Sequence, residues 1–155
     1  MTSNTSNVRN IWREIEKDYR VSKLSFGKKI NFVTDKFKRK VLFRDIEQAF
    51  VLANDGFAKP AVILVGGVIE ELLRLYLSYK NITPSTNSLD SYIKACENGG
   101  LLKSAIQKLA DFVRHFRNLV HLEREISKRD TISQATAKGA VASIFTIVND
   151  FEKST

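Results

Sequence analysis

Residues 61–69 read AVILVGGVI, a run without a single polar side chain. A helix formed by this run is apolar on every side, which is typical of a helix enclosed by others at the centre of a bundle. The run is too short to span a bilayer before Glu70 and Glu71 interrupt it. Gly66 and Gly67 each cost on the order of 1 kcal/mol in a helix. We therefore expect a buried central helix that another helix approaches closely at these glycines.

Helical spacing continues on both sides of this run. The central helix is predicted to begin near Pro60, which suits a first helical turn, and to end near Lys80. Further helices are predicted over about residues 8–19, 25–37, 41–55, 88–96, 102–125 and 133–152. No stretch alternates apolar and polar residues for long enough to form a strand. The sequence therefore predicts an all-α fold, a bundle of four to five main helices with an extra N-terminal helical segment.

Caps and apolar stripes define the expected helices more closely. Ser6 or Asn7 is expected to cap the first helix, Ser25 the second and Ser88 the short helix. Gly56 and the pair Gly99-Gly100 are expected to end helices. The expected buried stripes are Val8, Ile11, Trp12, Ile15 and Tyr19; Phe26, Ile30, Val33 and Phe37; Leu42, Ile46, Ala49, Phe50 and Ala53; and Val141, Ile144, Phe145, Val148 and Phe151.

Length and composition suit one domain. The chain has 155 residues, and residues 1–7 (MTSNTSN) are predicted to be a disordered tail. We expect a single domain over residues 8–155, with a basic helical extension at 8–40 and the core bundle at 41–152. Cys96 is the one cysteine, which excludes an internal disulfide and predicts a buried apolar role. No secretion signal is recognised, so a cytoplasmic protein without a membrane segment is expected.

Positive charge is concentrated at the N-terminal end. The formal charge is +8, and residues 1–44 hold twelve Lys and Arg against four Asp and Glu, whereas residues 45–155 hold thirteen of each sign. Such an excess attracts polyanions, with RNA, DNA and anionic membrane as candidates, or else forms a solvated face. Phe37, interpreted as a core residue, interrupts a basic run whose cations are candidate RNA contacts: Lys36, Lys38, Arg39 and Lys40.

Residues 109–122 (LADFVRHFRNLVHL) contain both histidines, His115 and His121. At about 100° per residue, Arg114, Asn118 and His121 form one polar stripe at i, i+4 and i+7, with His115 on its flank. The opposite side of that helix is apolar, with Leu109, Phe112, Phe116, Leu119 and Val120.

This stripe has two interpretations. In the first it is the solvated side of a core helix. In the second it is a site that holds a phosphate and moves a proton, which requires a partner surface. Two histidines six apart, without thiolates or a carboxylate set, lack zinc-ligand spacing, so no metal or other cofactor is predicted.

The carboxylates Glu70 and Glu71 are neighbours, so on a helix they point about 100° apart. We therefore favour a Glu70–Arg74 ion pair at i, i+4 over a catalytic carboxylate pair.

Three segments together resemble the HEPN superfamily of small α-helical bundles. They are RDIEQAF (44–50), GFAKPAVILVGGVIEELLRLYL (56–77) and VRHFRNLVHL (113–122). The family is marked by an arginine, four to six intervening residues and a histidine on a late helix, with a polar residue commonly after the arginine. Arg114, followed by His115 and later by His121, fits this pattern, and the resemblance covers about residues 44–122.

The resemblance implies a bundle that dimerises and, in catalytic members, cuts RNA without a metal. Arg114 and His121 would act across a homodimer interface, with Asn118 and His115 as further catalytic candidates and Arg117 as a substrate contact. Arg117 has only three residues between it and His121, so the choice between the two arginines stays open. Leu122 and Glu123 replace the residue-tyrosine pair that follows the histidine in many toxin members.

Two function classes follow from the resemblance. The first is a metal-independent endoribonuclease, a toxin or phage-defence component with an antitoxin or other protein partner. The second is a non-catalytic HEPN-like module that binds nucleic acid or protein through its basic N-terminal end.

Overall fold

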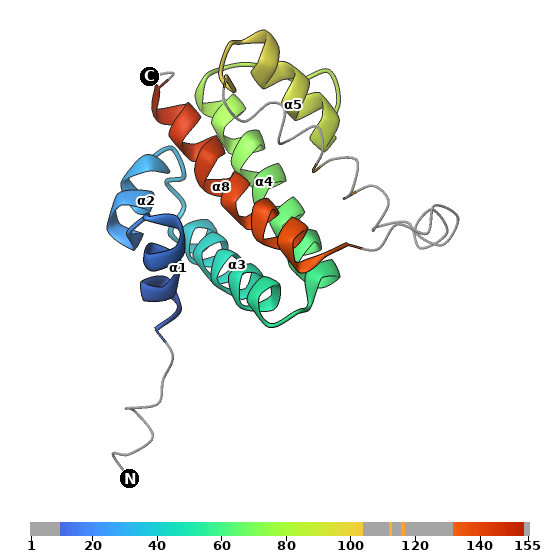
Figure 1. Cartoon of the computed structure of the whole chain (residues 1–155). Helices are drawn as coiled ribbons and strands as arrows, with labels where there is room; N and C mark the ends of the chain where they lie inside the picture. The colour runs from blue at the N-terminus through green and yellow to red at the C-terminus, as the bar shows by residue number, and fades with distance from the viewer. Residues whose placement is uncertain (1–9, 104–111, 113–115, 117–131, 154–155) are drawn as a thin grey trace, which may run out of the picture.

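The computed structural model describes residues 10–103, 112, 116 and 132–153 (Figure 1). Every regular element within these parts is a helix, which confirms the all-α prediction. The helices are α1 (Ile11–Tyr19), α2 (Lys23–Lys29), α3 (Lys36–Asn54), α4 (Ala58–Tyr79), α5 (Leu89–Asn98) and α8 (Gln134–Lys153).

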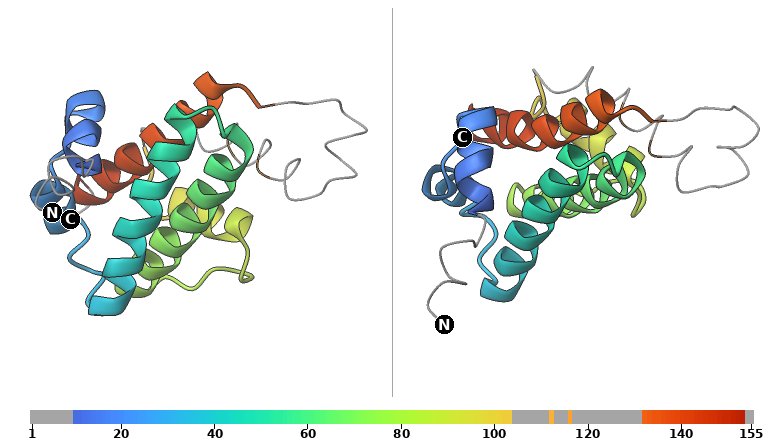
Figure 2. Two further views of the ribbon diagram at one scale, coloured as in Figure 1. Left: turned by 90° about the horizontal axis from the view of Figure 1, so that it is seen from below. Right: turned by 60° about the horizontal axis from the view of Figure 1, so that its bottom comes forward.

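Helix α4 is the centre of the bundle, as the apolar run predicts. It packs against α3, α5 and α8, and α3 and α8 also contact each other. Helices α1 and α2 lie on one side of this group and α5 lies on the other (Figures 1 and 2). Most of the apolar run is buried, although Ile63 is 39% exposed and Gly67 is exposed as well. None of the described helices is long and apolar enough to cross a membrane.

The predicted apolar stripes of α3 and α8 are confirmed in full. Each of these side chains is buried: Leu42, Ile46, Ala49, Phe50, Ala53, Val141, Ile144, Phe145, Val148 and Phe151. Aromatic contacts join α4 to the end of α8, because the Tyr76 and Phe151 rings stack with centroids 3.8 Å apart. The Tyr76 hydroxyl also donates a hydrogen bond to the Phe151 carbonyl oxygen over 3.0 Å.

The helix starts differ from prediction at the N-terminal end. Asn10, not Ser6 or Asn7, caps α1, and Ser22, not Ser25, caps α2. The Ser22 Oγ accepts a hydrogen bond from the Ser25 backbone N–H over 3.1 Å, so α2 begins at Lys23. The helix then ends at Lys29, and the chain turns before the next helix begins.

Phe37 was predicted to be buried and is 73% exposed. The reason is the cap at Asp35, whose Oδ1 accepts from the backbone N–H groups of Phe37 and Lys38 over 2.9 and 3.1 Å. Phe37 is therefore in the first turn of α3 and does not end the preceding helix. On α3 it lies about 180° from the buried Ile46, at 100° per residue, so it points away from the core.

The helix ends near the glycines agree with prediction. Gly56, with φ of 90°, follows α3, and Ser88 caps α5, which ends at Asn98 before Gly99-Gly100. Gly100 has φ of 71°, a conformation that favours glycine.

Candidate functional site

The polar stripe residues lie outside the described residues: Arg114, His115, Arg117, Asn118 and His121. Two apolar residues of the same segment, Phe112 and Phe116, are described and are helical. Phe112 is 6% exposed, and Phe116 is half-buried and packs against the core. Their rings are 5.8 Å apart between centroids and inclined by 18°. Both aromatic side chains thus face the bundle, as the apolar side of the segment predicts.

The contact surface for Phe116 is Gly66 of α4. A Cβ atom placed on Gly66 would lie 2.3 Å from Cε2 of the Phe116 ring, far inside van der Waals contact. The absence of a side chain at Gly66 therefore lets the ring reach the α4 backbone. The predicted close approach is confirmed at Gly66. At the exposed Gly67, no atom of the described residues lies within 4 Å of such a Cβ.

The predicted ion pair of Glu70 with Arg74 is wrong, because Arg74 pairs with Glu71. The guanidinium of Arg74 donates two hydrogen bonds to the Glu71 carboxylate, one of them from Nε to Oε2 over 3.1 Å. The hydrogen bond with Glu71 raises the pKa of Arg74. Glu71 also lies 4.0 Å from the Nζ of Lys38 on α3. An i, i+3 partner is as close on a helix as an i, i+4 partner, and only Glu71 also faces α3.

Glu70 instead lines a polar hollow of about 750 Å³ between α4, the 81–87 connection and α5. Glu70 is one helical turn beyond Gly66 on the same side of α4, and Arg74, Asn81, Asn87 and Tyr92 also line the hollow. A polar concave surface thus begins next to the position where Phe116 contacts α4.

The basic run at the start of α3 divides into structural and exposed cations. Arg39 donates hydrogen bonds to the carbonyl oxygens of Gly27, Ile30 and Val33 over 2.9, 2.9 and 3.3 Å. It thereby satisfies carbonyl groups at the end of α2 and in the turn that follows. Lys36 and Lys40 are exposed. The structural role of Arg39 was not apparent from the sequence, because its neighbours in the run are equally basic.

No described group has the character of a metal site or a reactive thiol. Within residues 10–103, 112, 116 and 132–153, no three His, Cys, Asp or Glu side chains cluster closely enough to hold a metal ion. Cys96 is fully buried, and burial raises the pKa of its thiol to about 12. A protonated, enclosed thiol is neither a nucleophile nor a ligand at neutral pH.

Comparisons with protein-family models, with curated proteins and with solved structures find no match to this chain. Support for a function therefore comes from the residue pattern and from the packing described above.

Proposed function

We propose that this chain is a HEPN-like, metal-independent endoribonuclease that acts as a homodimer, as a toxin or phage-defence component. The observation that supports this proposal is the contact between Phe116 and Gly66, because it places an apolar residue of the predicted motif helix against α4. On a helix, Arg114, Asn118 and His121 are spaced about 140° to 160° from Phe116. Their side chains would then be directed outward, where RNA and a second copy of the chain can reach them.

The proposed chemistry is an internal transesterification of RNA. The ribose 2′-oxygen attacks the adjacent phosphorus, the bond to the 5′-oxygen breaks, and the products are a 2′,3′-cyclic phosphate and a 5′-hydroxyl. Arg114 would stabilise the charge on the phosphate through paired N–H donors. His121 would accept the proton of the 2′-hydroxyl or donate one to the leaving 5′-oxygen, and water would carry out the other of these two proton transfers. Asn118 and His115 would orient the reacting groups, and Arg117 would contact the RNA backbone.

A cleavage assay on mixed cellular RNA in excess EDTA tests this function. We expect wild-type cleavage to survive EDTA and to leave cyclic phosphate ends. Loss of a general acid or base lowers rates by about 10² to 10⁴, and loss of a donor that stabilises transition-state charge by about 10² to 10³. The rates of His121→Ala and Arg114→Ala should therefore each fall by at least about 10². Lys94→Ala is the matched control, because Lys94 is an exposed cation on α5 and should keep full activity.

Two results would contradict the ribonuclease. One is the absence of cleavage by the wild type across several RNAs, and the other is equal cleavage by the wild type and both variants. Arg117→Ala decides which arginine acts, because only the catalytic one should lower the rate of the chemical step rather than RNA affinity.

The second candidate, a non-catalytic nucleic-acid-binding module, is favoured by a different observation. Lys36 and Lys40 are exposed at the start of α3, next to the exposed ring of Phe37. Cations and an accessible aromatic ring together suit a single-stranded polyanion. For this candidate we expect RNA binding without cleavage, with an affinity that falls as salt is added. An affinity that is insensitive to salt would exclude the basic end as the contact surface.

A further inference from the structure

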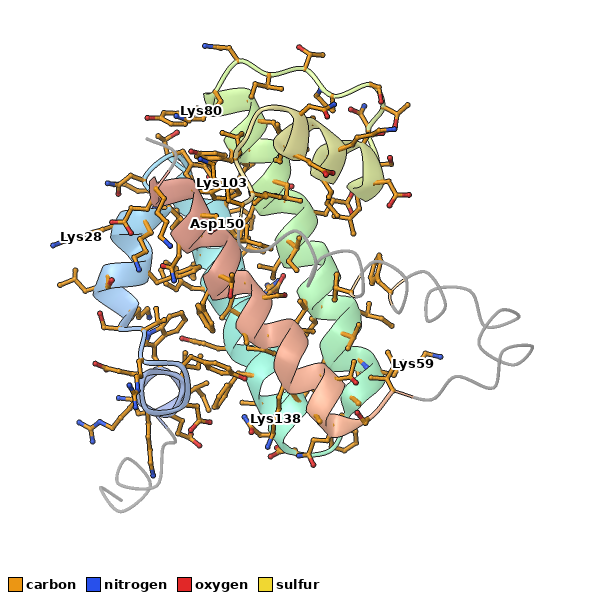
Figure 3. All side chains as sticks on the ribbon, turned by 45° about the horizontal axis from the view of Figure 1, so that its top comes forward. Lys28, Lys59, Lys80, Lys103, Lys138 and Asp150 are labelled. Atoms are coloured by element: carbon orange, nitrogen blue, oxygen red, sulfur yellow. The ribbon has the colours of Figure 1, made fainter. Side chains whose placement is uncertain are left out.

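A hollow of about 550 Å³ lies between α2, the end of α4 and the end of α8. Four aromatic rings line it: Phe32, Tyr76, Tyr79 and Phe151. Lys28, Lys29 and Glu152 lie at its border together with small polar residues of α2. In Figure 3, Lys28 on α2 and Lys80 just beyond α4 lie on different sides of the C-terminal end of α8. The hollow therefore combines ring surfaces with two cations of α2, and Lys80 lies close to it, with its Nζ 5.7 Å from the Tyr76 ring centroid.

The rings of the hollow differ in their exposure. Tyr76 and Phe151 are each 1% exposed and stack on each other, so they form a fixed floor. Phe32 is half-buried and meets Tyr76 edge-on, with centroids 5.0 Å apart. Tyr79 is 57% exposed, and its ring centroid is 6.1 Å from that of Phe32. Tyr79 is thus an accessible ring supported by packed ones.

The cations also differ in what holds them. The Nζ of Lys29 donates to the Asn149 side-chain oxygen over 2.6 Å and lies 3.8 Å from the Glu152 carboxylate, so Lys29 ties α2 to α8. Lys28, the preceding residue of α2, is exposed. The Nζ of Lys80 lies 5.7 Å and 5.8 Å from the ring centroids of Tyr76 and Tyr79. Positive charge therefore lies on two elements near the accessible ring.

We propose that this hollow holds one base of a single-stranded RNA, stacked on Tyr79, with the flanking phosphates near Lys28 and Lys80. Every base has a face that can stack on an aromatic ring, and this face is accessible only when the strand is unpaired. The volume suits a nucleotide, and the amide of Asn31, which lines the hollow, can hydrogen-bond to a base edge. A lipid surface would instead require apolar groups that protrude, and here the rings line a concavity.

This site deepens the proposed function and depends on it in one respect, the choice of RNA as the ligand. It would hold the strand at a surface formed by α2, α4 and α8, which is separate from the contact of Phe116 with α4. Binding can be measured apart from cleavage when the probe lacks a 2′-hydroxyl nucleophile.

The test is fluorescence anisotropy with a labelled, single-stranded 2′-O-methyl oligonucleotide of about twelve nucleotides. Stacking on one ring contributes about 1–3 kcal/mol, so we expect Tyr79→Ala to weaken binding by roughly 5- to 140-fold. Tyr79→Phe keeps the ring and should bind as the wild type does. The matched control is Phe57→Ala, because Phe57 is 58% exposed at the start of α4 and provides no side-chain cap.

The cations are tested with a second matched pair. Lys28→Glu should weaken binding and reduce its salt dependence between about 50 and about 200 mM salt. Lys138→Glu should leave both unchanged, because Lys138 is exposed near the start of α8, away from Lys28 (Figure 3). Circular dichroism of each variant separates a loss of binding from a loss of fold.

Several outcomes would overturn this site. They are equal affinities for Tyr79→Ala and Phe57→Ala, equal binding of duplex and single strand, and a Tyr79-dependent binding of phosphatidylserine vesicles without RNA binding. The ribonuclease can fail independently: Tyr79-dependent binding by a wild type that cleaves no RNA would support the hollow and remove the proposed activity. Conversely, cleavage with no effect of Tyr79→Ala on oligonucleotide affinity would support the activity and remove the hollow.

Discussion

Two close contacts stabilise this bundle by opposite means. At the centre, Phe116 rests against Gly66 of α4, a contact made possible by the absence of a side chain. At the turn between α2 and α3, Arg39 donates hydrogen bonds to the carbonyl oxygens of Gly27, Ile30 and Val33. The first contact depends on shape and dispersion, whereas the second depends on polar groups that satisfy each other.

The two regions also differ in how far the sequence reveals them. Apolar periodicity and a glycine within a helix predict the central contact, because the residue type at each position is enough to recognise both. A run of cations does not show which of its members bonds to the backbone. Apolar patterns therefore predict which residues are buried better than charged patterns predict which cations have a structural role.

The largest effect on stability is expected at the turn between α2 and α3. Arg39→Ala removes the donor for three carbonyl groups. Hydrogen bonds from a charged group contribute about 1.5–3 kcal/mol each and do not add fully, so we expect a loss of about 3 kcal/mol in the free energy of unfolding. The urea midpoint, measured at an unchanged m-value, gives this loss.

Lys40→Ala is the control for that measurement, because Lys40 is the next residue and is exposed. Surface substitutions of this kind usually change stability by less than about 0.5 kcal/mol. If both variants unfold at the same urea concentration, the hydrogen bonds of Arg39 do not stabilise the turn between α2 and α3.

A smaller effect is expected at the central contact, where two adjacent glycines form a matched pair. Gly66→Ala places a methyl group 2.3 Å from the Phe116 ring and should cost about 1–2 kcal/mol, after the gain in helix propensity. Gly67→Ala meets no described atom within 4 Å and should instead stabilise the protein by up to about 1 kcal/mol. Thermal and urea unfolding of the two variants should thus shift in opposite directions.

The double variant Gly66→Ala with Phe116→Ala isolates the contact itself. If the methyl group and the ring compete for the same space, the two changes together should destabilise less than the sum of their separate effects. Strict additivity would show that Phe116 does not restrict Gly66 in solution.

Most of the fold could be predicted, because a helix with a buried side has apolar residues at helical spacing. The stripes of α3 and α8 and the ends of helices at Gly56 and Gly99-Gly100 were predicted correctly. The caps at Asn10 and Ser22 were missed, because several serine and asparagine residues near each start are equally good acceptors. Phe37 was misassigned because the second helix was expected to continue to it, whereas α2 ends at Lys29 and Asp35 caps a new helix.

The candidate site could be predicted only in part. The polar stripe of residues 109–122 stays a prediction, because its members lie outside the described residues, whereas the predicted burial of Phe112 is confirmed. The hollow at Tyr79 could not be found in this way, because Phe32, Tyr79 and Phe151 are brought together by three elements far apart in the chain. Glu71 was likewise missed as the partner of Arg74. Glu71 also lies close to Lys38 of α3, and the sequence does not show that these two helices meet there.

The smallest predicted effect is the loss of stability near pH 9, which grows as the pH rises further. Burial raises the pKa of Cys96, in α5 beside α4, from 9.0 to about 12. Above pH 9 the unfolded chain loses the thiol proton and the folded chain keeps it, so stability that is fully present below pH 9 is lost as the pH rises toward 12. At a pH near 9 the loss is only roughly half a kcal/mol, because about half of the unfolded thiols are then ionised.

Tyr19 of α1 contributes in the same direction, because burial and, secondarily, the charge of Asp18 raise its pKa from 10.0 to about 12. Its hydroxyl donates to the Lys138 carbonyl oxygen over 3.2 Å, a bond that an ionised phenolate cannot donate. Urea midpoints measured between about pH 8 and about pH 11 should fall for the wild type and fall less steeply for Cys96→Ala and for Tyr19→Phe. A slope unchanged in Cys96→Ala but reduced in Tyr19→Phe would assign the alkaline loss to the N-terminal region.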